Sequence, residues 1–432
     1  MKVIVLGAGV VGTAAAWFLN KAGHEVTVID RQPVAGNETS FANGGQISVS
    51  HAEPWANPSA PLKVLKWLAR EDAPLLFRLR LDPAQWRWCA RFMLECLPSR
   101  TRHNIEQIVR LGLYSRATLQ ALRAETGIAY DHLQRGILHF YTSEREFAAA
   151  IEPARVMREH GCDVQMVDTA RCIEIEPALA SARDRLVGGS YTPSDESGDA
   201  HTFSVELARL AQARGVHFLT ETRILGLERS GDRVSAVHVV DVNGTPSALT
   251  ADAYVMALGS YSALALRPLG ISVPVYPAKG YSVTLPVRSA QAAPTVSLTD
   301  DEYKIVITRL GDRLRCAGTA ELNGYDTGLN EVRCRAIADR LFALFPDAGE
   351  RSRIRYWTGL RPATPSNVPL IGRSRIGNLY LDTGHGTLGW THACGSGKAL
   401  ADIISGRTPE IDFAFLGGGQ RGPRGVPQLA GT

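Results

Sequence analysis

The chain has 432 residues, of which 45% are hydrophobic and 21% are charged, and its formal net charge is +4. This length favours two or three interleaved domains over one compact core, and the composition is typical of a soluble globular protein. The small net charge gives no indication of nucleic-acid binding, and seven scattered cysteines without a CxxC pair predict neither a disulfide framework nor a metal site.

The first thirty residues have the order of a dinucleotide-binding unit. A short apolar strand at 2–6 is followed by GAGVVG, a helix, and a second strand that ends at Asp30. Gly7 permits a tight turn, Gly9 lets the backbone approach a pyrophosphate, and Gly12 allows close helix–strand packing. The helix N-terminus attracts phosphate, and Asp30 can accept hydrogen bonds from a ribose. A glycine-rich turn without a ligand is the alternative, but the complete order favours dinucleotide binding.

The rest of the chain alternates helical and extended patterns, with no internal repeat. The segment 38–48, ETSFANGGQIS, shows neither helical nor strand periodicity and is predicted to be a loop. The other expected elements are helices at 62–125 (interrupted by Pro74, Pro83 and Pro98), a strand at 135–143, helices at 144–161 and 200–215, strands within 216–260 and 274–320, a helix at 330–345, and a strand at 378–383.

A second glycine-rich junction lies near the C-terminus, at 384–391, GHGTLGWT. It joins a strand to a helix, so free N–H groups at the helix N-terminus can face a ligand. A flavin ring has an edge that becomes negative on reduction, and such a junction suits that edge. A nicotinamide cofactor has no comparable need, so the sequence favours FAD.

The order of these elements predicts an α/β fold combined with an α+β fold. A Rossmann-like FAD-binding domain is expected to form from the separated segments 1–60, 195–265 and 355–415. A substrate domain with a mixed antiparallel sheet is expected from 61–194 and 266–354. The Gly/Pro-rich segment 416–432 is expected to be a flexible tail.

Several of these segments together resemble the bacterial D-amino acid dehydrogenases of the small-subunit type, within the D-amino acid oxidase-like superfamily of flavoenzymes. The resemblance covers about residues 1–410, and its most particular motifs are FANGGQIS and GLRPATPSN. It implies oxidative deamination of D-amino acids, with D-alanine among the substrates, to 2-oxo acids and ammonia by hydride transfer to a non-covalent FAD. It further implies that a quinone or another non-oxygen acceptor takes the electrons.

The resemblance also implies which residues contact FAD. They are the ADP-binding strand–turn–helix, the loop beside the flavin ring, the segments beside adenine and AMP, and the junction over the pyrimidine edge. By number they are Val5, Gly7, Ala8, Gly9, Val10, Val11, Gly12, Asp30, Arg31, Ser40, Asn43, Gly44, Gly45, Gln46, Ile224, Ala257, Gly259, Gly386, Thr387, Leu388, Gly389, Trp390 and Thr391.

Arg361, in WTGLRP, corresponds by resemblance to the arginine that binds the substrate carboxylate, and a guanidinium fork suits that role. The alternative is a surface arginine before a proline. The carbonyl of Thr387 is expected to accept a hydrogen bond from the substrate amine, and Lys279 to face the pocket. The superfamily's active-site tyrosine has three candidates, of which Tyr281 is assigned to the site and the other two are Tyr276 and Tyr303.

Two histidines lie near these motifs, His385 inside the GHG junction and His51 just after the flavin-side loop. Each could transfer a proton, but a role through the backbone or in packing is favoured. The nearby Cys394 is expected to be a small buried side chain and not a covalent flavin attachment point.

Residues 62–102 combine Trp67, Trp86 and Trp88 with many lysines and arginines. Aromatic and basic side chains on apolar helices fit a membrane surface, and a domain core with a solvated basic side is the alternative. No secretory signal and no membrane-spanning run is recognised. The protein is therefore expected in the cytoplasm, either free or as a peripheral protein on the inner face of the cytoplasmic membrane.

Two other functions are compatible with these patterns. One is a glycine- or sarcosine-type amine oxidase that uses O2. The other is a catalytically silent flavoprotein that serves as a binding or assembly factor, against which the GLRP context of Arg361 argues.

Overall fold

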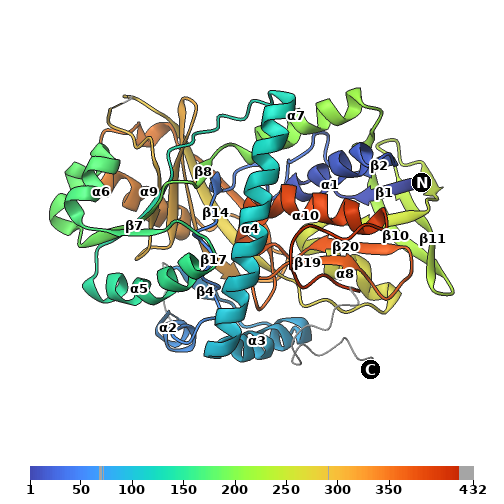
Figure 1. Cartoon of the computed structure of the whole chain (residues 1–432), viewed down its shortest axis with the longest axis horizontal. Helices are drawn as coiled ribbons and strands as arrows, with labels where there is room; N and C mark the ends of the chain where they lie inside the picture. The colour runs from blue at the N-terminus through green and yellow to red at the C-terminus, as the bar shows by residue number, and fades with distance from the viewer. Residues whose placement is uncertain (68–70, 72, 290, 418–432) are drawn as a thin grey trace.

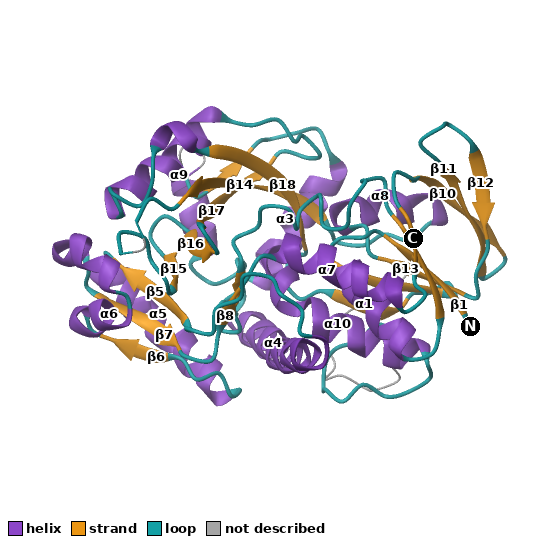
Figure 2. Cartoon of the chain, turned by 90° about the horizontal axis from the view of Figure 1, so that it is seen from above, coloured by secondary structure: helices purple, strands orange, loops and turns teal. Residues whose placement is uncertain are grey.

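The computed structural model describes residues 1–67, 71, 73–289 and 291–417. Two large sheets lie side by side, with the short β3–β8 pair between them (Figure 2). The long helix α4 (Pro98–Thr126) stands between the two halves of the molecule (Figure 1). None of the helices in these residues is long and apolar enough to cross a membrane.

The six-stranded sheet has the order β19–β20–β13–β1–β2–β9, with β19 antiparallel to its neighbour and the other strands parallel. Its strands are β1 (Lys2–Leu6), β2 (Glu25–Ile29), β9 (His217–Leu219), β13 (Ala253–Met256), β19 (Leu370–Arg373) and β20 (Leu379–Thr383). In β1, Val3 and Val5 face the core under the helices, whereas Ile4 and Leu6 face the opposite core. The central strand is thus buried on both faces, as expected for a parallel sheet.

Helices cover one face of this sheet, and a small sheet covers the other. The helices are α1 (Val10–Lys21), α7 (Ala200–Ala213) and α10 (Gly389–Ile404). The small antiparallel sheet contains β10 (Arg223–Ser230), β11 (Arg233–Val240) and β12 (Pro246–Leu249), with α8 (Ser262–Leu266) nearby.

The nine-stranded sheet is mixed, because β15 pairs with β5, and β17 with β4, in parallel. Its order is β18–β14–β17–β16–β15–β5–β7–β6, with β4 beside β17. The strands are β4 (Leu75–Phe77), β5 (Ile137–Tyr141), β6 (Gln165–Val167), β7 (Gly188–Thr192), β14 (Tyr276–Pro286), β15 (Ser297–Asp300), β16 (Ile305–Leu310), β17 (Arg313–Leu322) and β18 (Arg355–Ala363). The remaining elements are β3 (Gln46–Ile47), β8 (Glu196–Ser197), α2 (Ala60–Trp67), α3 (Pro83–Glu95), α5 (Glu144–Glu159), α6 (Thr169–Ile175) and α9 (Glu331–Leu344).

Three sequence-based expectations need correction. The stretch 62–125 is not entirely helical, because residues 75–77 form β4 beside β17. The segment from 355 does not enter the nucleotide-type sheet at once, because β18 pairs with β14 in the nine-stranded sheet. Of the predicted flexible tail, residue 416 forms a bridge with Gly372, and the segment 418–432 lies outside the described residues.

The loop after β3 is fixed by one buried carboxylate. Asp195, with no exposed surface, accepts hydrogen bonds from the N–H groups of Val49 (3.0 Å) and Ser50 (3.1 Å) and from the hydroxyls of Ser48 (3.1 Å) and Ser50 (2.7 Å). Arg116 of α4 lies 3.0 Å from the same carboxylate. Asp195 therefore ties the loop to the long central helix.

Replacing this carboxylate tests its role. Asp195→Ala should lower the free energy of unfolding by about 3–5 kcal/mol, because Arg116 and the loop donors lose a buried acceptor. Denaturant unfolding measures the change. As a control, Glu174→Ala, which breaks an exposed pair with Arg171, should change stability by less than about 0.5 kcal/mol. Equal losses in the two variants would contradict the assigned anchor.

Candidate active site

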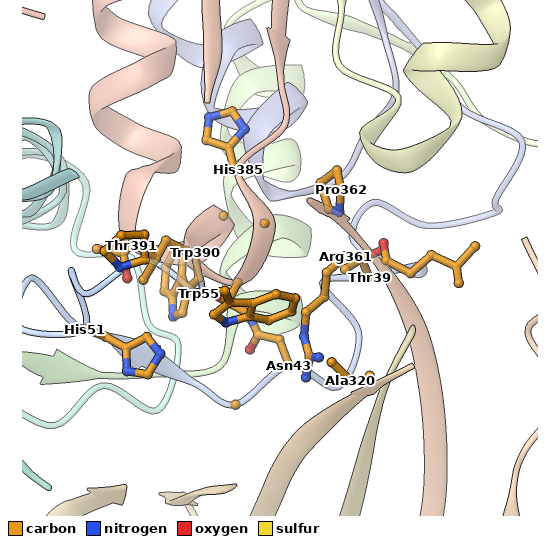
Figure 3. A pocket seen from close by; sticks show the side chains of 18 of the residues that line it. Thr39, Asn43, His51, Trp55, Ala320, Arg361, Pro362, His385, Trp390 and Thr391 are labelled. Carbon is orange, nitrogen blue, oxygen red and sulfur yellow. The ribbon is translucent and has the colours of Figure 1, made fainter. Parts of the chain in front are cut away.

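A cavity of about 1580 Å³ extends from the carboxyl edge of the six-stranded sheet to the face of the nine-stranded sheet. It exceeds the range of about 300–1,000 Å³ that is usual for a small-ligand site. Its wall is built from loops of both halves, and Figure 3 shows part of it. The volume leaves room for a large ligand together with a small one.

The glycine turn after β1 forms one end of the cavity. Gly7 has a φ of +107°, and a Cβ on Gly12 would lie 2.0 Å from the Gly7 carbonyl oxygen, so a side chain at 12 would separate helix from strand. A Cβ on Gly9 would meet nothing nearer than the Ser40 hydroxyl oxygen, at 3.9 Å. Gly9 therefore opens the backbone toward the cavity.

The same turn presents hydrogen-bond donors. The Val10 N–H donates to the Ser40 hydroxyl at 3.1 Å. In the part of the chain that the structure describes, no acceptor bonds the N–H groups of Gly9 and Val11. Together with the dipole of α1, these free groups make a site for an anion.

Asp30 follows β2 and lines the cavity. Its carboxylate accepts hydrogen bonds from the N–H groups of Ala8 (2.7 Å) and Gln32 (2.8 Å). Burial raises the pKa of Asp30, and the two N–H groups oppose that shift. The remaining lone pairs of its oxygens are free for a ligand hydroxyl.

Most residues predicted to contact FAD line this cavity, and three do not. Val5 points into the core from β1, Ala8 directs its N–H to Asp30, and Gly12 packs against Gly7. For these three, direct contact is corrected to a supporting position. Those in the wall are Gly7, Gly9, Val10, Val11, Asp30, Arg31, Ser40, Asn43, Gly44, Gly45, Gln46, Ile224, Ala257, Gly259, Gly386, Thr387, Leu388, Gly389, Trp390 and Thr391.

The junction between β20 and α10 borders the middle of the cavity. The Trp390 indole N–H donates to the Gly198 carbonyl at 3.0 Å, and the Ser48 N–H donates to the Thr391 hydroxyl at 3.0 Å. These bonds hold the junction against the loop after β3. Thr387 is half-buried in the short 3-10 helix Gly386–Leu388 and lines the cavity.

His385 is buried behind this junction. Its Nε2 lies 3.2 Å from the Ser396 hydroxyl oxygen and 3.4 Å from Asp382 Oδ1. Burial lowers the pKa of His385 to about 3 and raises that of Asp382 well above its usual range. A neutral imidazole in this position favours the packing interpretation of His385.

Arg361 projects from β18 into the cavity wall (Figure 3). Its guanidinium donates to the carbonyls of Thr319 (2.6 Å) and Gly318 (3.4 Å), and no carboxylate of the described residues pairs with it. A Cβ on Gly280 would lie 2.3 Å from the guanidinium carbon, so the glycine of KGYS provides its space. Burial lowers the pKa of Arg361 to about 10, which leaves it cationic at neutral pH.

An unpaired cation in a cavity wall is costly unless an anion joins it. The arginine is therefore not the surface residue of the alternative interpretation. A guanidinium group can bind a carboxylate through two parallel hydrogen bonds.

The expectation that Lys279 faces the pocket is wrong. Lys279 is buried outside the cavity, where its Nζ lies 2.6 Å from Asp326 and 3.5 Å from Glu321. Tyr281 borders the cavity, but its ring packs in the core with α9 and its hydroxyl donates to Glu321. Lys279 is therefore removed from the site, whereas Tyr281 stays at its border with its hydroxyl bonded to Glu321.

The other tyrosine candidates do not line the cavity. The Tyr276 hydroxyl donates to Asp82 at 3.0 Å, and Tyr303 is 44% exposed. The cavity wall instead contains Tyr141 and Tyr261. Sequence reasoning missed them because neither stands in a recognisable motif.

His51 and Trp55 line the cavity on the loop that precedes α2. Burial lowers the pKa of His51 to about 4, so its imidazole is neutral, and its ring lies 5.7 Å from that of His139. Trp55 was not predicted, since HAEPWANP matches no motif.

Comparisons with known proteins agree with this arrangement. The family described as FAD dependent oxidoreductase matches residues 2–403. A D-amino acid dehydrogenase of Dechloromonas aromatica is 62% identical, covering 96% of this chain and 100% of the relative, and one of Paramagnetospirillum magneticum is 57% identical, covering 96% and 98%. Glycine oxidase from Geobacillus kaustophilus has a similar structure, with a TM-score of 0.74, 22% identity, and 95% and 96% coverage. The predicted fold class, family resemblance and FAD cofactor are thereby confirmed.

The buried histidines behind the junction should affect stability. His392 has no exposed surface, and burial lowers its pKa to about 3, a shift that the Ile108 backbone opposes only in part. In the unfolded chain this pKa returns to about 6.5. The unfolded state therefore binds more protons than the folded state between pH 6.5 and 3. As the pH falls through this range, the buried neutral His392 lowers the free energy of unfolding, and above pH 6.5 this loss is absent.

Removing this imidazole should flatten the pH dependence. His392→Leu should reduce the slope of unfolding free energy against pH, below pH 6.5, by up to about 1.4 kcal/mol per pH unit. The opposite contribution of Asp382 is present in both proteins and cancels in the comparison. Denaturant unfolding from pH 7 to 4.5 measures the slopes. The exposed His217→Leu variant should keep the wild-type slope, and an unchanged slope in His392→Leu would contradict the prediction.

Proposed function

The chain belongs to the FAD-dependent oxidoreductase family, and we propose that it is a dehydrogenase that converts D-amino acids to 2-oxo acids and ammonia. The observation that carries this proposal is the unpaired Arg361 guanidinium in the wall of a cavity large enough for FAD and a small substrate. The two D-amino acid dehydrogenases that are 62% and 57% identical to this chain support the D-configuration of the substrate. D-Alanine is the substrate proposed for the first test.

The residues present fit FAD. The free N–H groups at the start of α1 suit the pyrophosphate, the Asp30 carboxylate suits the ribose, and Ile224 lies where the adenine is proposed to bind. The junction 386–391 is proposed to lie at the pyrimidine edge of the flavin ring, with the loop 40–46 beside it. When bound, FAD supplies the oxidised ring that takes two electrons from the substrate.

The chain's own residues bind and orient the substrate. Arg361 is proposed to hold the α-carboxylate, and the Thr387 carbonyl to accept a hydrogen bond from the amine. Burial keeps His385 and His51 neutral, so neither imidazole repels the amine, and the amine is proposed to be oxidised in its neutral form. The imino acid that results is hydrolysed to the 2-oxo acid and ammonia.

Anaerobic flavin bleaching tests this function. D-Alanine should reduce the bound flavin and L-alanine should not. Arg361→Ala should lower kcat/KM by two orders of magnitude, a loss of about 3 kcal/mol of transition-state stabilisation, because the carboxylate loses its charged partner. Arg355→Ala, at the exposed start of the same strand, is the matched control and should behave as the wild type. Reduction by glycine or sarcosine alone would favour the amine-oxidase alternative, and no reduction by any amine would favour the silent flavoprotein.

The electron acceptor is proposed to be a membrane quinone or a relay to one. On α3 and just after it, Trp86, Met93, Leu94 and Leu97 are 50–57% exposed and follow a helical spacing, so an apolar stripe faces solvent. Met93 also borders the cavity. This stripe supports docking at the inner face of the cytoplasmic membrane.

The other two tryptophans of the basic segment do not add to this stripe. Trp88 is buried, and its indole N–H donates to the Ala363 carbonyl at 2.9 Å, as the core interpretation predicts. The Trp67 side chain lies outside the described residues.

Vesicle sedimentation tests the docking face. Wild-type protein should bind anionic phospholipid vesicles, helped by the exposed Arg87 and Arg91, and the double variant Leu94→Ser/Leu97→Ser should bind several-fold less because apolar contact is lost. The double variant Leu329→Ser/Val332→Ser removes side chains of similar exposure (52% each) elsewhere and is the matched control. Equal binding by all three proteins would rule out the α3 stripe as the contact.

A further inference from the structure

One side of the cavity, beyond His51, is charged. Its charged or titratable side chains come from the loop before α2, from α2, β5 and α5, and from the turn between β15 and β16. They are Glu53, Lys63, His139, Glu146, Asp301 and Lys304. We refer to these six residues as the charged arm.

Most of the charged arm is internally paired. The Asp301 carboxylate lies 2.8 Å from Lys304 Nζ and 2.9 Å from His139 Nδ1, and Lys63 Nζ lies 2.9 Å from Glu146. Burial alone would raise the pKa of Asp301, but Lys304 and His139 hold it well below its usual range. These charges therefore neutralise one another.

Glu53 is the exception. Its carboxylate accepts one hydrogen bond from the Asn57 amide, at 3.1 Å, and no lysine or arginine of the described residues forms an ion pair with it. Glu53 is exposed on the cavity wall, where the surrounding chain raises its pKa and the charges of Lys304 and Lys63 oppose that shift. Lys304 cannot turn to it without leaving Asp301, and its left-handed backbone (φ +53°) fixes the turn that holds this pair.

The charged arm lies next to the carboxylate site. His51 lines the cavity, and the centre of its ring lies 5.7 Å from that of His139 in the charged arm. In the view of Figure 3, Trp55 separates His51 from Arg361. Glu53 lies between His51 and Trp55 in the chain, on the loop that carries both. A substrate with its α-carboxylate on Arg361 can thus extend its side chain along this loop.

We propose that Glu53 is a specificity-determining residue and that the charged arm accepts D-amino acids with a cationic side chain, such as D-lysine. This inference rests on the proposed oxidation of D-amino acids at Arg361. An aliphatic side chain would cover Glu53 and leave its carboxylate desolvated without a partner, which is costly. An ammonium or guanidinium group would pair with it through a charge-assisted hydrogen bond.

The test compares D-lysine and D-norleucine in the FAD-loaded enzyme. Both substrates have the same number of carbon atoms, and D-lysine adds a terminal ammonium group. Wild-type protein should have the higher kcat/KM for D-lysine, and Glu53→Gln should lower the D-lysine to D-norleucine ratio about tenfold or more. D-Norleucine carries no charge, so it reports the residual activity of each variant. Glu146→Gln removes a carboxylate that is already paired in the same arm, and it should change the ratio much less.

The outcomes separate this inference from the function on which it rests. If no D-amino acid bleaches the flavin anaerobically, the proposed function fails. If D-alanine bleaches it but D-lysine is no better than D-norleucine, or the ratio is equal in wild type and Glu53→Gln, the role of Glu53 is overturned. If Glu53→Gln does not retain FAD, Glu53→Asp keeps the charge, and retention of most of the D-lysine preference in that variant supports the proposal, whereas its loss overturns it.

Discussion

The guanidinium of Arg361 carries a positive charge into the cavity wall without a carboxylate of the described chain to neutralise it. Two backbone carbonyls orient it but cannot cancel the charge, so the site is complete only with an anion. Several local features hold the guanidinium in the cavity wall. Gly280 provides the space beside the guanidinium, and Thr319 adopts a left-handed backbone (φ +53°) at the carbonyl that receives its strongest hydrogen bond.

This constraint also explains why the cavity needs both sheets. The six-stranded sheet supplies loops with free N–H groups and the Asp30 carboxylate, which suit a dinucleotide. The nine-stranded sheet supplies the arginine from β18, paired in register with β14. The loop after β3 lies between them and is fixed to α4 by Asp195 and to α10 by Thr391. The cofactor side and the substrate side are thus held in one rigid frame.

Sequence reasoning predicted the short motifs of the site, but it did not predict the contacts between segments that are far apart in the chain. The turn at Gly7 and the junction at 384–391 are short motifs whose chemistry depends on neighbouring residues, and both line the cavity as expected. Lys279 was misassigned because its face follows from the pairing of β14 with β17, which places it opposite Glu321, where its ammonium also pairs with Asp326. The charged arm could not be predicted, because its members come from five separate segments whose contacts no single motif records.

The electrostatics of the cavity limit how it can handle protons. Burial keeps both nearby imidazoles, His51 and His385, neutral, and the Tyr281 hydroxyl is committed to Glu321. Neither imidazole titrates near neutral pH, so neither is assigned as the base of the proposed reaction. Besides the charges of the charged arm that pair with one another, the cation of Arg361 and the carboxylate of Glu53 face the cavity, and on the proposal above they discriminate among substrates by charge. The site therefore selects and orients its substrate, while the oxidising power belongs to the cofactor.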